Sequence, residues 1–422
     1  MKILLSSVAC SPFGGSEGIY GWRACRAIAD LHEVWVLTDA GNRDQIEQAK
    51  QQGLVPKSMH FEYLGSPRNC HSNRLIARLQ SWRRYQEFQK ASLAIAMQLH
   101  SKIGFDLAQL ITFTTWRVGC PLWKMKIPFI WGPISGTEMF PWRFLKMLSP
   151  ISQIFELFRA FSTWRSRRNQ DVRDCAVYSS KIIAIHEQSR SFLADLRRSS
   201  NEITVYSSWF FEDEHIATLT QPRDFNSGSA PLRMVAGGNL EGRKGIAVAL
   251  HALRKVADAG IPFHYRVTSR GPELPFLLRL VKKLALEDSV HLGEPFPAGK
   301  YVDRLREFDI CLLPSLREGG GLTLMESMLA GCVPIVAACG GPGDTVTIDC
   351  GFPIPVTTPE KMIDEIANAV IQLHRNREAL QTLGTAARTR LQSRATEKGF
   401  RDFMERVYAA LTLEKTIPSL EP

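Results

Sequence analysis

The stretch that decides the fold runs from Ile310 to Val336 and reads ICLLPSLREGGGLTLMESMLAGCVPIV. It begins with an apolar run typical of a strand, Ile310–Leu313, and continues with a loop that holds Glu318 and three glycines. Apolar residues then recur at helical spacing up to Gly331, and Val333–Val336 is predicted to be a second buried strand. The stretch is therefore a strand–loop–helix–strand unit, which indicates an α/β fold with a parallel sheet.

Two carboxylates, Glu318 and Glu326, stand eight positions apart at the junction of this loop and helix. On one continuous helix that spacing would turn them about 80° apart, but Glu318 precedes the helix. Both can therefore point to the carboxyl end of the strand, where open α/β sheets bind ligands. The glycines allow close approach of a ligand, and the first free amides of a helix favour an anion. A sugar nucleotide combines hydroxyls with a diphosphate and fits these features. The alternative is that both glutamates are solvated, as most charged residues are.

The whole string resembles the Glu-x7-Glu signature of retaining glycosyltransferases with the GT-B fold, especially glycosyltransferase family 4. The resemblance extends over the loop, the glycines, the helix and the following strand, which reads Gly-x-x-Pro-Ile-Val from Gly331. It implies an α/β protein of two Rossmann-like, doubly wound parallel-sheet domains that face each other across a cleft. It also implies transfer from a nucleotide-sugar donor without a protein nucleophile or a metal, so no cofactor is expected. The sequence has no Asp-x-Asp motif, which agrees with this expectation.

The catalytic residues implied by the resemblance are Glu318, Lys244 and Arg243. Glu318 would accept hydrogen bonds from donor-sugar hydroxyls, and Lys244 would hold the donor diphosphate. Arg243 and Lys244 stand where a helix is predicted to begin, an end whose dipole repels cations, so a bound anion is expected there. The segment resembles the family's Gly-Arg-Leu…Lys-Gly element, but Asn239 occupies the arginine position, and we hypothesise that Arg243 replaces that arginine.

The remaining donor-binding candidates share a place in a loop or at a helix start after a predicted strand. They are Gly14, Gly15, Gly238, Asn239, Arg270, Gly271, Gly320, Gly321, Leu322, Thr323 and Glu326. Glu326 is expected to bind the ribose hydroxyls. For Gly14 and Gly15, a tight turn that simply requires glycine is the alternative.

Three residues are acceptor-site candidates: Glu17, Glu138 and His186. Glu17 belongs to the first glycine loop. Glu138 ends the string WGPISGTE, which resembles a Gly-Pro-x-Gly-Gly-x-Glu element of family members that make polysaccharides; a solvated loop glutamate is the alternative. His186 follows the predicted strand Lys181–Ile185, although a lone histidine at such a place is more often structural.

A chain of 422 residues with 45% hydrophobic and 22% charged residues is expected to form two globular domains. We expect an N-terminal Rossmann-like, acceptor-binding domain over 1–220 and a linker over 221–231, which is rich in Pro, Gly and Ser. A nucleotide-sugar-binding domain is expected over 232–395. Residues 396–422 are expected to form a helix that packs back on the N-terminal domain.

The protein is expected to be cytoplasmic. No apolar run approaches the 18 or so residues that span a bilayer, and the apolar part of Met1–Cys10 is too short for a signal sequence. The nine cysteines are scattered without a Cys-x2-Cys pair, which favours reduced thiols over disulfides or a zinc site.

Positive charge is concentrated between Arg68 and Arg168, where 16 Lys and Arg stand against 4 Asp and Glu, although the whole chain has a net charge of +10. Within this region, 140–168 alternates aromatic and basic residues. Stacking on nucleic acid would use both kinds of residue, but the sequence has no nucleic-acid-binding motif and no such partner is expected. Either a helix lies peripherally on an anionic membrane surface, or the aromatics face the core and the basic side is solvated. The pattern leaves both open.

Taken together, these features predict a retaining glycosyltransferase, of hexosyltransferase type, in cell-envelope, exopolysaccharide or glycolipid synthesis. Its acceptor is expected to be a glycan or a lipid-linked glycan. Two alternatives are a sugar-nucleotide epimerase of the same fold and a non-catalytic protein that binds glycans or a lipid surface.

Overall fold

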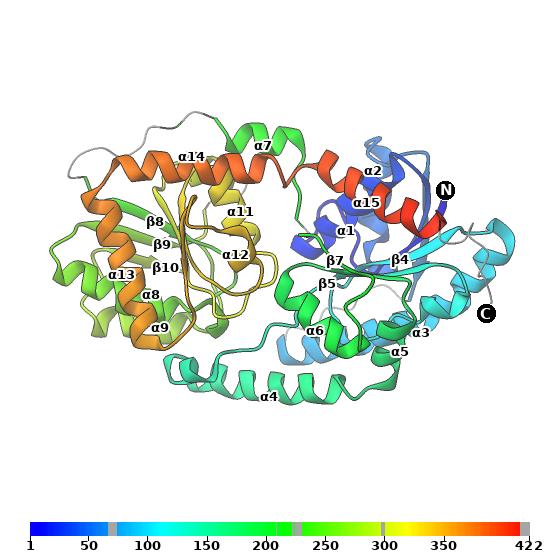
Figure 1. The fold of residues 1–422 in the computed structure, drawn as a ribbon, viewed down its shortest axis with the longest axis horizontal. Helices are drawn as coiled ribbons and strands as arrows, with labels where there is room; N and C mark the ends of the chain where they lie inside the picture. Colours follow the sequence, from blue (N-terminus) through cyan, green and yellow to red (C-terminus); the bar gives the residue numbers. More distant parts are fainter. Residues whose placement is uncertain (66–73, 208, 222, 224–229, 297–299, 414–422) are drawn as a thin grey trace. The chain divides into compact units, whose positions relative to one another are not determined.

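A computed structural model describes the chain except residues 66–73, 208, 222, 224–229, 297–299 and 414–422 (Figure 1). The side chains of 74–81 and of Leu413 are also outside the described part. The chain divides into two compact units. Unit 1 comprises Met1–Thr137, Thr163–Ser208 and Glu397–Pro422, and unit 2 comprises Glu138–Ser162 and Trp209–Thr396.

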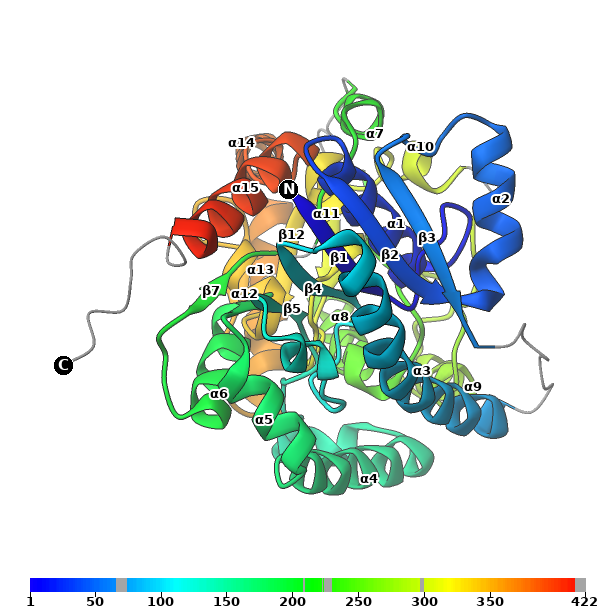
Figure 2. The same ribbon diagram turned by 90° about the vertical axis from the view of Figure 1, so that its right-hand side faces the viewer.

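Unit 1 is built on a seven-stranded sheet in which all strand pairs of the described residues are parallel. The strands are β1 (Lys2–Ser7), β2 (Glu33–Asp39), β3 (Met59–Leu64), β4 (Leu107–Thr112), β5 (Phe129–Ile134), β6 (Lys181–Ala184) and β7 (Ile203–Val205). Their order is β3-β2-β1-β4-β5-β6-β7, and Figure 2 shows β3, β2, β1 and β4 side by side in this order. This is the strand order of a doubly wound Rossmann-like sheet.

Helices connect these strands. They are α1 (Ser16–Ala29), α2 (Arg43–Gln51), α3 (Arg74–Ile103), α5 (Gln170–Tyr178), α6 (Glu187–Arg197) and α15 (Glu397–Leu413), with the 3-10 helices η1 (Ala40–Asn42) and η2 (Pro121–Met125). Side chains of α3, α5 and α6 form one core cluster with the sheet, and α1 packs against α15.

Unit 2 repeats the arrangement with a six-stranded parallel sheet. Its strands are β8 (Leu232–Ala236), β9 (Phe263–Val267), β10 (Val290–Leu292), β11 (Ile310–Leu313), β12 (Val333–Ala337) and β13 (Phe352–Ile354), in the order β10-β9-β8-β11-β12-β13. Its helices are α7 (Asp213–Leu219), α8 (Ile246–Asp258), α9 (Leu274–Lys283), α10 (Tyr301–Leu305), α11 (Leu322–Leu329), α12 (Gly340–Thr345), α13 (Pro359–Arg375) and α14 (Glu378–Gln392), with η3 (Trp142–Met147) and η4 (Gly242–Lys244). Helix α4 (Pro150–Ser166) begins in unit 2 and ends in unit 1.

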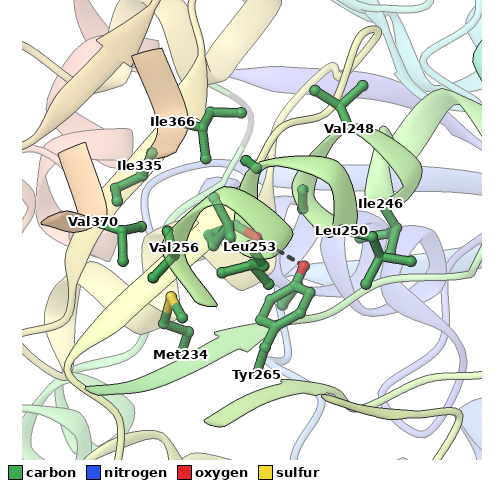
Figure 3. Packing of buried hydrophobic residues seen from close by; sticks show 14 of the residues in the cluster. Met234, Ile246, Val248, Leu250, Leu253, Val256, Tyr265, Ile335, Ile366 and Val370 are labelled. Carbon is green, nitrogen blue, oxygen red and sulfur yellow. Dashed lines mark hydrogen bonds between the residues drawn. The ribbon is translucent and has the colours of Figure 1, made fainter. Parts of the chain in front are cut away.

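Alternate residues of the unit 2 strands face two different cores, as the pleat of a strand requires. Met234 and Ile335 pack with α8, α9 and α13 on one face, and Val235 and Val336 pack with α11 and α14 on the other. Figure 1 shows α8, α9 and α13 on one side of this sheet and α11 and α14 on the other. Figure 3 shows the first of these cores, where the Tyr265 hydroxyl donates to the Leu312 carbonyl at 3.3 Å. Because both faces are covered, the central strands β11 and β12 are apolar and buried at every position.

The order of the strands reverses between β1 and β4 in unit 1 and between β8 and β11 in unit 2. Ligands of doubly wound sheets bind at this switch point, beyond the carboxyl ends of the strands. The Glu318 loop follows β11 and the Lys244 loop follows β8, so the sheet places both at the switch point of unit 2.

The boundaries of the units differ from the predicted domains. Residues 138–162 belong to unit 2, where Phe140, Phe144 and Leu148 enter its core, although the sequence analysis assigned them to the N-terminal domain. Residues 209–220 also belong to unit 2. The apolar residues of a segment show that it packs into a core, but they do not show which of the two sheets it packs against. Most of the predicted linker lies outside the described residues.

The last helix belongs to unit 1. The Tyr408 hydroxyl donates to the Gln109 side chain of β4 at 2.5 Å, and Arg401 donates to Asp30 at 2.8 Å. Phe403 stacks on Tyr206 with their ring centroids 4.0 Å apart. These contacts bury one face of α15 against the sheet of unit 1.

Candidate active site

The two loops at the switch point of unit 2 are joined to each other. β8 and β11 are neighbours in register, with Met234 beside Ile310. Beyond them, the Leu316 amide donates to the Arg243 carbonyl at 2.8 Å. A Cβ at Gly245, where φ is +66°, would overlap the Pro314 carbonyl oxygen. The backbone of the Lys244 loop is therefore held directly against that of the Glu318 loop, which requires glycine at this point.

Glu318, Lys244 and Arg243 form one buried cluster. The Lys244 ammonium donates to a Glu318 carboxylate oxygen at 2.5 Å, and Arg243 donates to the same oxygen at 3.3 Å. Arg243 also donates to the Glu241 carboxylate at 2.6 Å and to the Arg317 carbonyl at 3.1 Å. Glu318 is only 8% exposed and Lys244 only 7%. The three residues that the sequence analysis named as catalytic thus lie in contact.

The two cations determine the charge state of Glu318. Burial raises the pKa of its carboxyl, but the positive charges of Lys244 and Arg243 outweigh this effect and hold the pKa below its ordinary value. Burial lowers the pKa of Arg243, and the carboxylates of Glu318 and Glu241 raise it more, to a net increase. Glu318 and Arg243 are therefore both charged at neutral pH.

The predicted repulsion between these cations and the positive end of a helix dipole does not arise, because neither cation lies at the start of α8. Arg243 and Lys244 form η4 and are followed by the left-handed Gly245, after which α8 begins. Arg243 and Lys244 form ion pairs with the carboxylates of Glu241 and Glu318. In this structure these carboxylates balance the positive charges, a task that the sequence analysis assigned to a bound anion.

Two glycines after β8 are required by close packing. A Cβ at Gly238, where φ is +89°, would lie 2.9 Å from the Lys244 ammonium nitrogen. A Cβ at Gly237 would lie 2.7 Å from Thr323 at the start of α11 and 3.0 Å from the Tyr301 hydroxyl. Gly238 therefore lies against Lys244, and the adjacent Gly237 lies against Thr323 in the first turn of α11.

Glu326 lies farther along α11 and has a partner that the sequence did not reveal. Its carboxylate is 3.5 Å from Nε2 of His215, and its side chain is 11% exposed. His215 stacks on Phe211 with an interplanar angle of 2°. Burial raises the pKa of Tyr301, and the nearby Glu326 carboxylate raises it further. His215 stands in a segment without a recognisable motif, so no signal identified it in advance.

The glycine turn after β12 closes on the Glu318 loop. This turn is the short helix α12. The Gly341 amide donates to the Glu318 carbonyl at 3.2 Å, and a Cβ at Gly340 would overlap that same carbonyl oxygen. The Glu138 side chain lies 3.5 Å from the position of such a Cβ. Glu138 is 3% exposed, and its negative charge raises the pKa values of both Glu318 and Arg243. This acceptor-site candidate is therefore near the cluster and is not a solvated loop residue.

The remaining donor-site candidates of unit 2 lie around this cluster. Asn239 is exposed and donates to Glu241 at 3.2 Å, and exposed Arg270 donates to the Gly293 carbonyl at 3.2 Å. A Cβ at Gly271 would overlap the backbone of Leu240. Gly321 precedes α11 with a φ of +68°, so Gly320, Gly321, Leu322 and Thr323 form the junction at which the helix begins.

The unit 1 candidates lie at the switch point of that sheet. Glu17, in the first turn of α1, accepts from the Thr114 amide beyond β4 at 3.1 Å. Burial raises the pKa of Glu17, and the bonds from Thr114 offset this only in part. Gly14 is tightly packed, since a Cβ added at this position would lie 3.2 Å from Cβ of Ser11. A Cβ at position 15 would have open space around it, so packing does not require Gly15 to be a glycine.

His186 has a structural position. It is fully buried and caps α6: its Nδ1 accepts from the Ser189 amide at 2.9 Å, and its Nε2 lies 3.2 Å from the Ser189 hydroxyl. A fully buried capping histidine fits a structural role better than contact with an acceptor.

Residues 138–162 supply contacts to the site that the sequence analysis missed. Arg317, next to Glu318, donates to Glu156 at 2.8 Å in a buried ion pair. The Ser149 hydroxyl donates to Glu273. A Cβ at Gly242, just before Arg243, would come within 2.9 Å of Cβ of Ser152. Helix α4 and the turn before it therefore support both loops of the cluster.

Within the described residues, no group of three or more His, Cys, Asp or Glu side chains could hold a metal ion. That the reaction needs no metal or cofactor stays a prediction. Among the helices of the described part of the chain, none has both the length and the apolar character to cross a bilayer.

Two doubly wound parallel sheets, with a cationic and carboxylate cluster at the switch point of the second, define the GT-B class. Sucrose-phosphate synthase of Thermosynechococcus elongatus has a similar structure, with a TM-score of 0.65 and 17% identity over 98% of this chain and 99% of that one. The HepE protein of Anabaena, in complex with UDP, gives a TM-score of 0.64 and 16% identity over 97% of this chain and 100% of that one. The predicted GT-B fold is thereby confirmed.

The sequence also resembles known glycosyltransferases. Residues 220–390, about two fifths of the chain, match the family model "Glycosyl transferases group 1". The chain is 29% identical over 198 residues to the Escherichia coli "Putative colanic acid biosynthesis glycosyltransferase WcaL", a match that covers 45% of this chain and 46% of that protein. The match thus spans about half the length of this curated relative.

Proposed function

We propose that the protein moves a hexosyl group from a nucleotide-sugar donor to an acceptor hydroxyl and retains the anomeric configuration. The observation that carries this proposal is the buried cluster of Glu318, Lys244 and Arg243 at the switch point of unit 2. The cluster lies within the residues that match the group 1 family model. The UDP complex of the structurally similar HepE protein supports a nucleotide-binding role for the fold.

The charge state of each group supports its proposed task. Because its pKa is lowered, Glu318 is an ionised acceptor at neutral pH and can receive hydrogen bonds from donor-sugar hydroxyls. Lys244 and Arg243 place two positive charges beside it, where the diphosphate would leave. Fixed charges at the point where negative charge develops stabilise a transition state more than a ground state.

The start of α11 offers a second source of stabilisation. The first amides of this helix, at Leu322 and Thr323, have no acceptor within the helix and favour an anion. Glu326, one turn farther, would accept from the ribose hydroxyls in a position supported by His215.

In the proposed reaction, the bond between the anomeric carbon and the diphosphate oxygen breaks, and the acceptor oxygen bonds to the same face of that carbon. The proton of the acceptor hydroxyl passes to the departing diphosphate oxygen. Lys244 and Arg243 stabilise the diphosphate as it leaves, and no protein nucleophile or metal takes part.

The acceptor is proposed to be a glycan or lipid-linked glycan, in cell-envelope or exopolysaccharide synthesis on the inner, cytoplasmic face of the plasma membrane. The Escherichia coli relative, whose name refers to colanic acid biosynthesis, supports this assignment. Glu138, which is buried near the cluster, is the proposed acceptor-site residue of unit 2, and Glu17 stays a separate candidate in unit 1.

A turnover assay tests the proposal. The full-length protein is incubated with UDP-, GDP- and ADP-hexoses, with and without a lipid extract from a polysaccharide-producing bacterium, and nucleoside diphosphate release is measured. We expect release from one donor that depends on the extract and is lost in Glu318→Gln but kept in Glu287→Gln, which changes an exposed glutamate of unit 2. Turnover without any acceptor would instead indicate an epimerase or hydrolase. Absence of both turnover and nucleotide binding would indicate a non-catalytic binding protein.

A further inference from the structure

Helix α4, which Figure 1 shows at its lower edge, has apolar residues that are exposed to solvent. Six large apolar side chains on it are each more than half exposed: Ile151, Ile154, Leu157, Phe158, Phe161 and Trp164. In the rest of the described chain, only Met97, Tyr178 and Ile348 reach that exposure. At 100° per residue, the six positions occupy an arc of about 140° on one side of the helix. They form a continuous stripe, which we call the α4 stripe.

The opposite side of the helix is polar and buried. Ser152, Glu156 and Thr163 lie within about 40° of one another on the helix, and each is at most 8% exposed. Glu156 accepts from Arg317 at 2.8 Å and Thr163 accepts from Arg117 at 2.9 Å. A helix on the surface of a water-soluble protein normally turns its apolar side inward. In α4 the arrangement is reversed, and specific polar contacts fix it.

Such a surface requires a partner, because contiguous apolar patches on a protein surface mark interaction sites. The charges around the α4 stripe identify the partner's chemistry. Arg143 and Lys146 are exposed before the helix, and Arg165 and Arg168 are exposed at its end. The two acidic residues of 138–170, Glu138 and Glu156, are both buried. The exposed charges of this segment are therefore all positive.

We propose that the α4 stripe docks the protein on an anionic lipid bilayer, with its apolar side chains between the lipids and its basic residues at the headgroups. An apolar helical face flanked by Arg and Lys is the pattern of helices that lie in a membrane interface. Two copies of the same stripe would bring their positive charges together, which opposes self-association through this surface.

The buried side of α4 gives the docking a consequence for the site. Glu156 holds Arg317, the neighbour of Glu318, so the helix that contacts lipid also supports the catalytic loop. That consequence rests on the proposed function, whereas the docking itself does not.

Vesicle flotation tests the proposal without any turnover. Full-length protein is mixed with vesicles of phosphatidylcholine alone, or with 40% phosphatidylglycerol, at low salt. The test variant is Ile154→Glu/Phe158→Glu, in which both positions are strongly exposed and folding should be kept, as a melting curve verifies. The control is Ile348→Glu, an exposed isoleucine of unit 2 that lies outside α4.

We expect the wild type and the control to float with anionic vesicles, and the double variant to bind at least tenfold more weakly. Binding of the wild type to phosphatidylcholine alone should also be weak. Equal binding by the double variant would overturn the proposal. So would a wild-type dimer that the double variant converts to a monomer in size-exclusion chromatography, because the stripe would then bind a second copy. If the double variant no longer floats but binds the donor as tightly as the wild type, the result supports membrane docking independently of the proposed function.

Discussion

Each unit places a glutamate at the switch point of its sheet, but the two glutamates have opposite electrostatic surroundings. In unit 1, Glu17 follows β1 and accepts from the Thr114 amide beyond β4. In unit 2, Glu318 follows β11 and accepts from Lys244 beyond β8. Burial is the largest influence on both carboxyl pKa values, yet the net shift is upward for Glu17 and downward for Glu318. The fold supplies the position, and the neighbouring cations decide which glutamate is held ionised.

The largest expected effect comes from removing the cation that distinguishes the two sites. Lys244→Ala should lower turnover by at least about 10²- to 10³-fold, because it removes a fixed charge from the site of the leaving diphosphate. The measurement is kcat with a saturating donor, and the control is Lys255→Ala, which removes an exposed lysine of α8. Full activity in Lys244→Ala would show that the cluster is structural.

The two glycine loops should differ in stability when a methyl group is added. Gly245→Ala should lower the free energy of unfolding by roughly 2–3 kcal/mol, because the new Cβ meets the Pro314 carbonyl at a left-handed φ. Gly15→Ala, with open space and a φ of −71°, should change it by no more than about 0.5 kcal/mol. Urea denaturation of both variants measures the difference, and equal losses would mean that the two loops are equally constrained.

The effect of Glu326→Ala should be confined to the nucleotide. Loss of hydrogen bonds to a charged acceptor typically weakens an interaction by about 1.5–3 kcal/mol, which is roughly 10- to 150-fold in Kd. Titration calorimetry with the preferred nucleoside diphosphate measures it, with Glu287→Ala as the control. An unchanged Kd would remove the ribose role.

The smallest expected effect is the opposite pH dependence of the two glutamates. The lowered pKa of Glu318 contributes stability above the unfolded-state value of about 4.3, and this is lost as the pH falls through the folded-state pKa. The raised pKa of Glu17 contributes stability below that value, and this is lost as the pH rises through the folded-state pKa.

Glu318→Gln should therefore flatten the loss of stability on acidification, and Glu17→Gln should raise stability at neutral pH relative to the wild type. Thermal unfolding between about pH 2 and pH 8 measures both, because the contribution of Glu318 is lost below its unfolded-state pKa. A parallel response of the two variants would contradict the electrostatic difference between the units.

The sequence predicted the parts of the site that local patterns determine. Glu318, Glu326 and the glycine junction belong to one strand–loop–helix segment, and Lys244 belongs to another, so periodicity and spacing placed each at the carboxyl end of a strand. The GT-B fold was predicted from the resemblance to a known glycosyltransferase family that these same segments carry. Retention and the donor identity remain predictions, since no observation on the chain tests them.

What the sequence did not predict depends on contacts between distant segments. Glu156 reaches Arg317 across 161 positions, and Ser149 reaches Glu273 across 124. In 140–168 the aromatic and basic residues left open which side of the helix is buried. The structure shows that the polar side is buried, because Glu156 and Ser152 have partners in unit 2. Helical periodicity defines two sides but does not reveal which one meets the core.

The central claim is that the switch point of unit 2 binds the diphosphate of a nucleotide donor. A thermal-shift panel of UDP, GDP, ADP and inorganic phosphate on the purified full-length protein tests it most directly. The account predicts that one nucleoside diphosphate stabilises the protein selectively, by about 2.7 kcal/mol at a concentration 100 times its Kd, and that Lys244→Ala loses this shift. No shift from any of the four would contradict the diphosphate site and leave the Lys244–Glu318 pair as a structural ion pair.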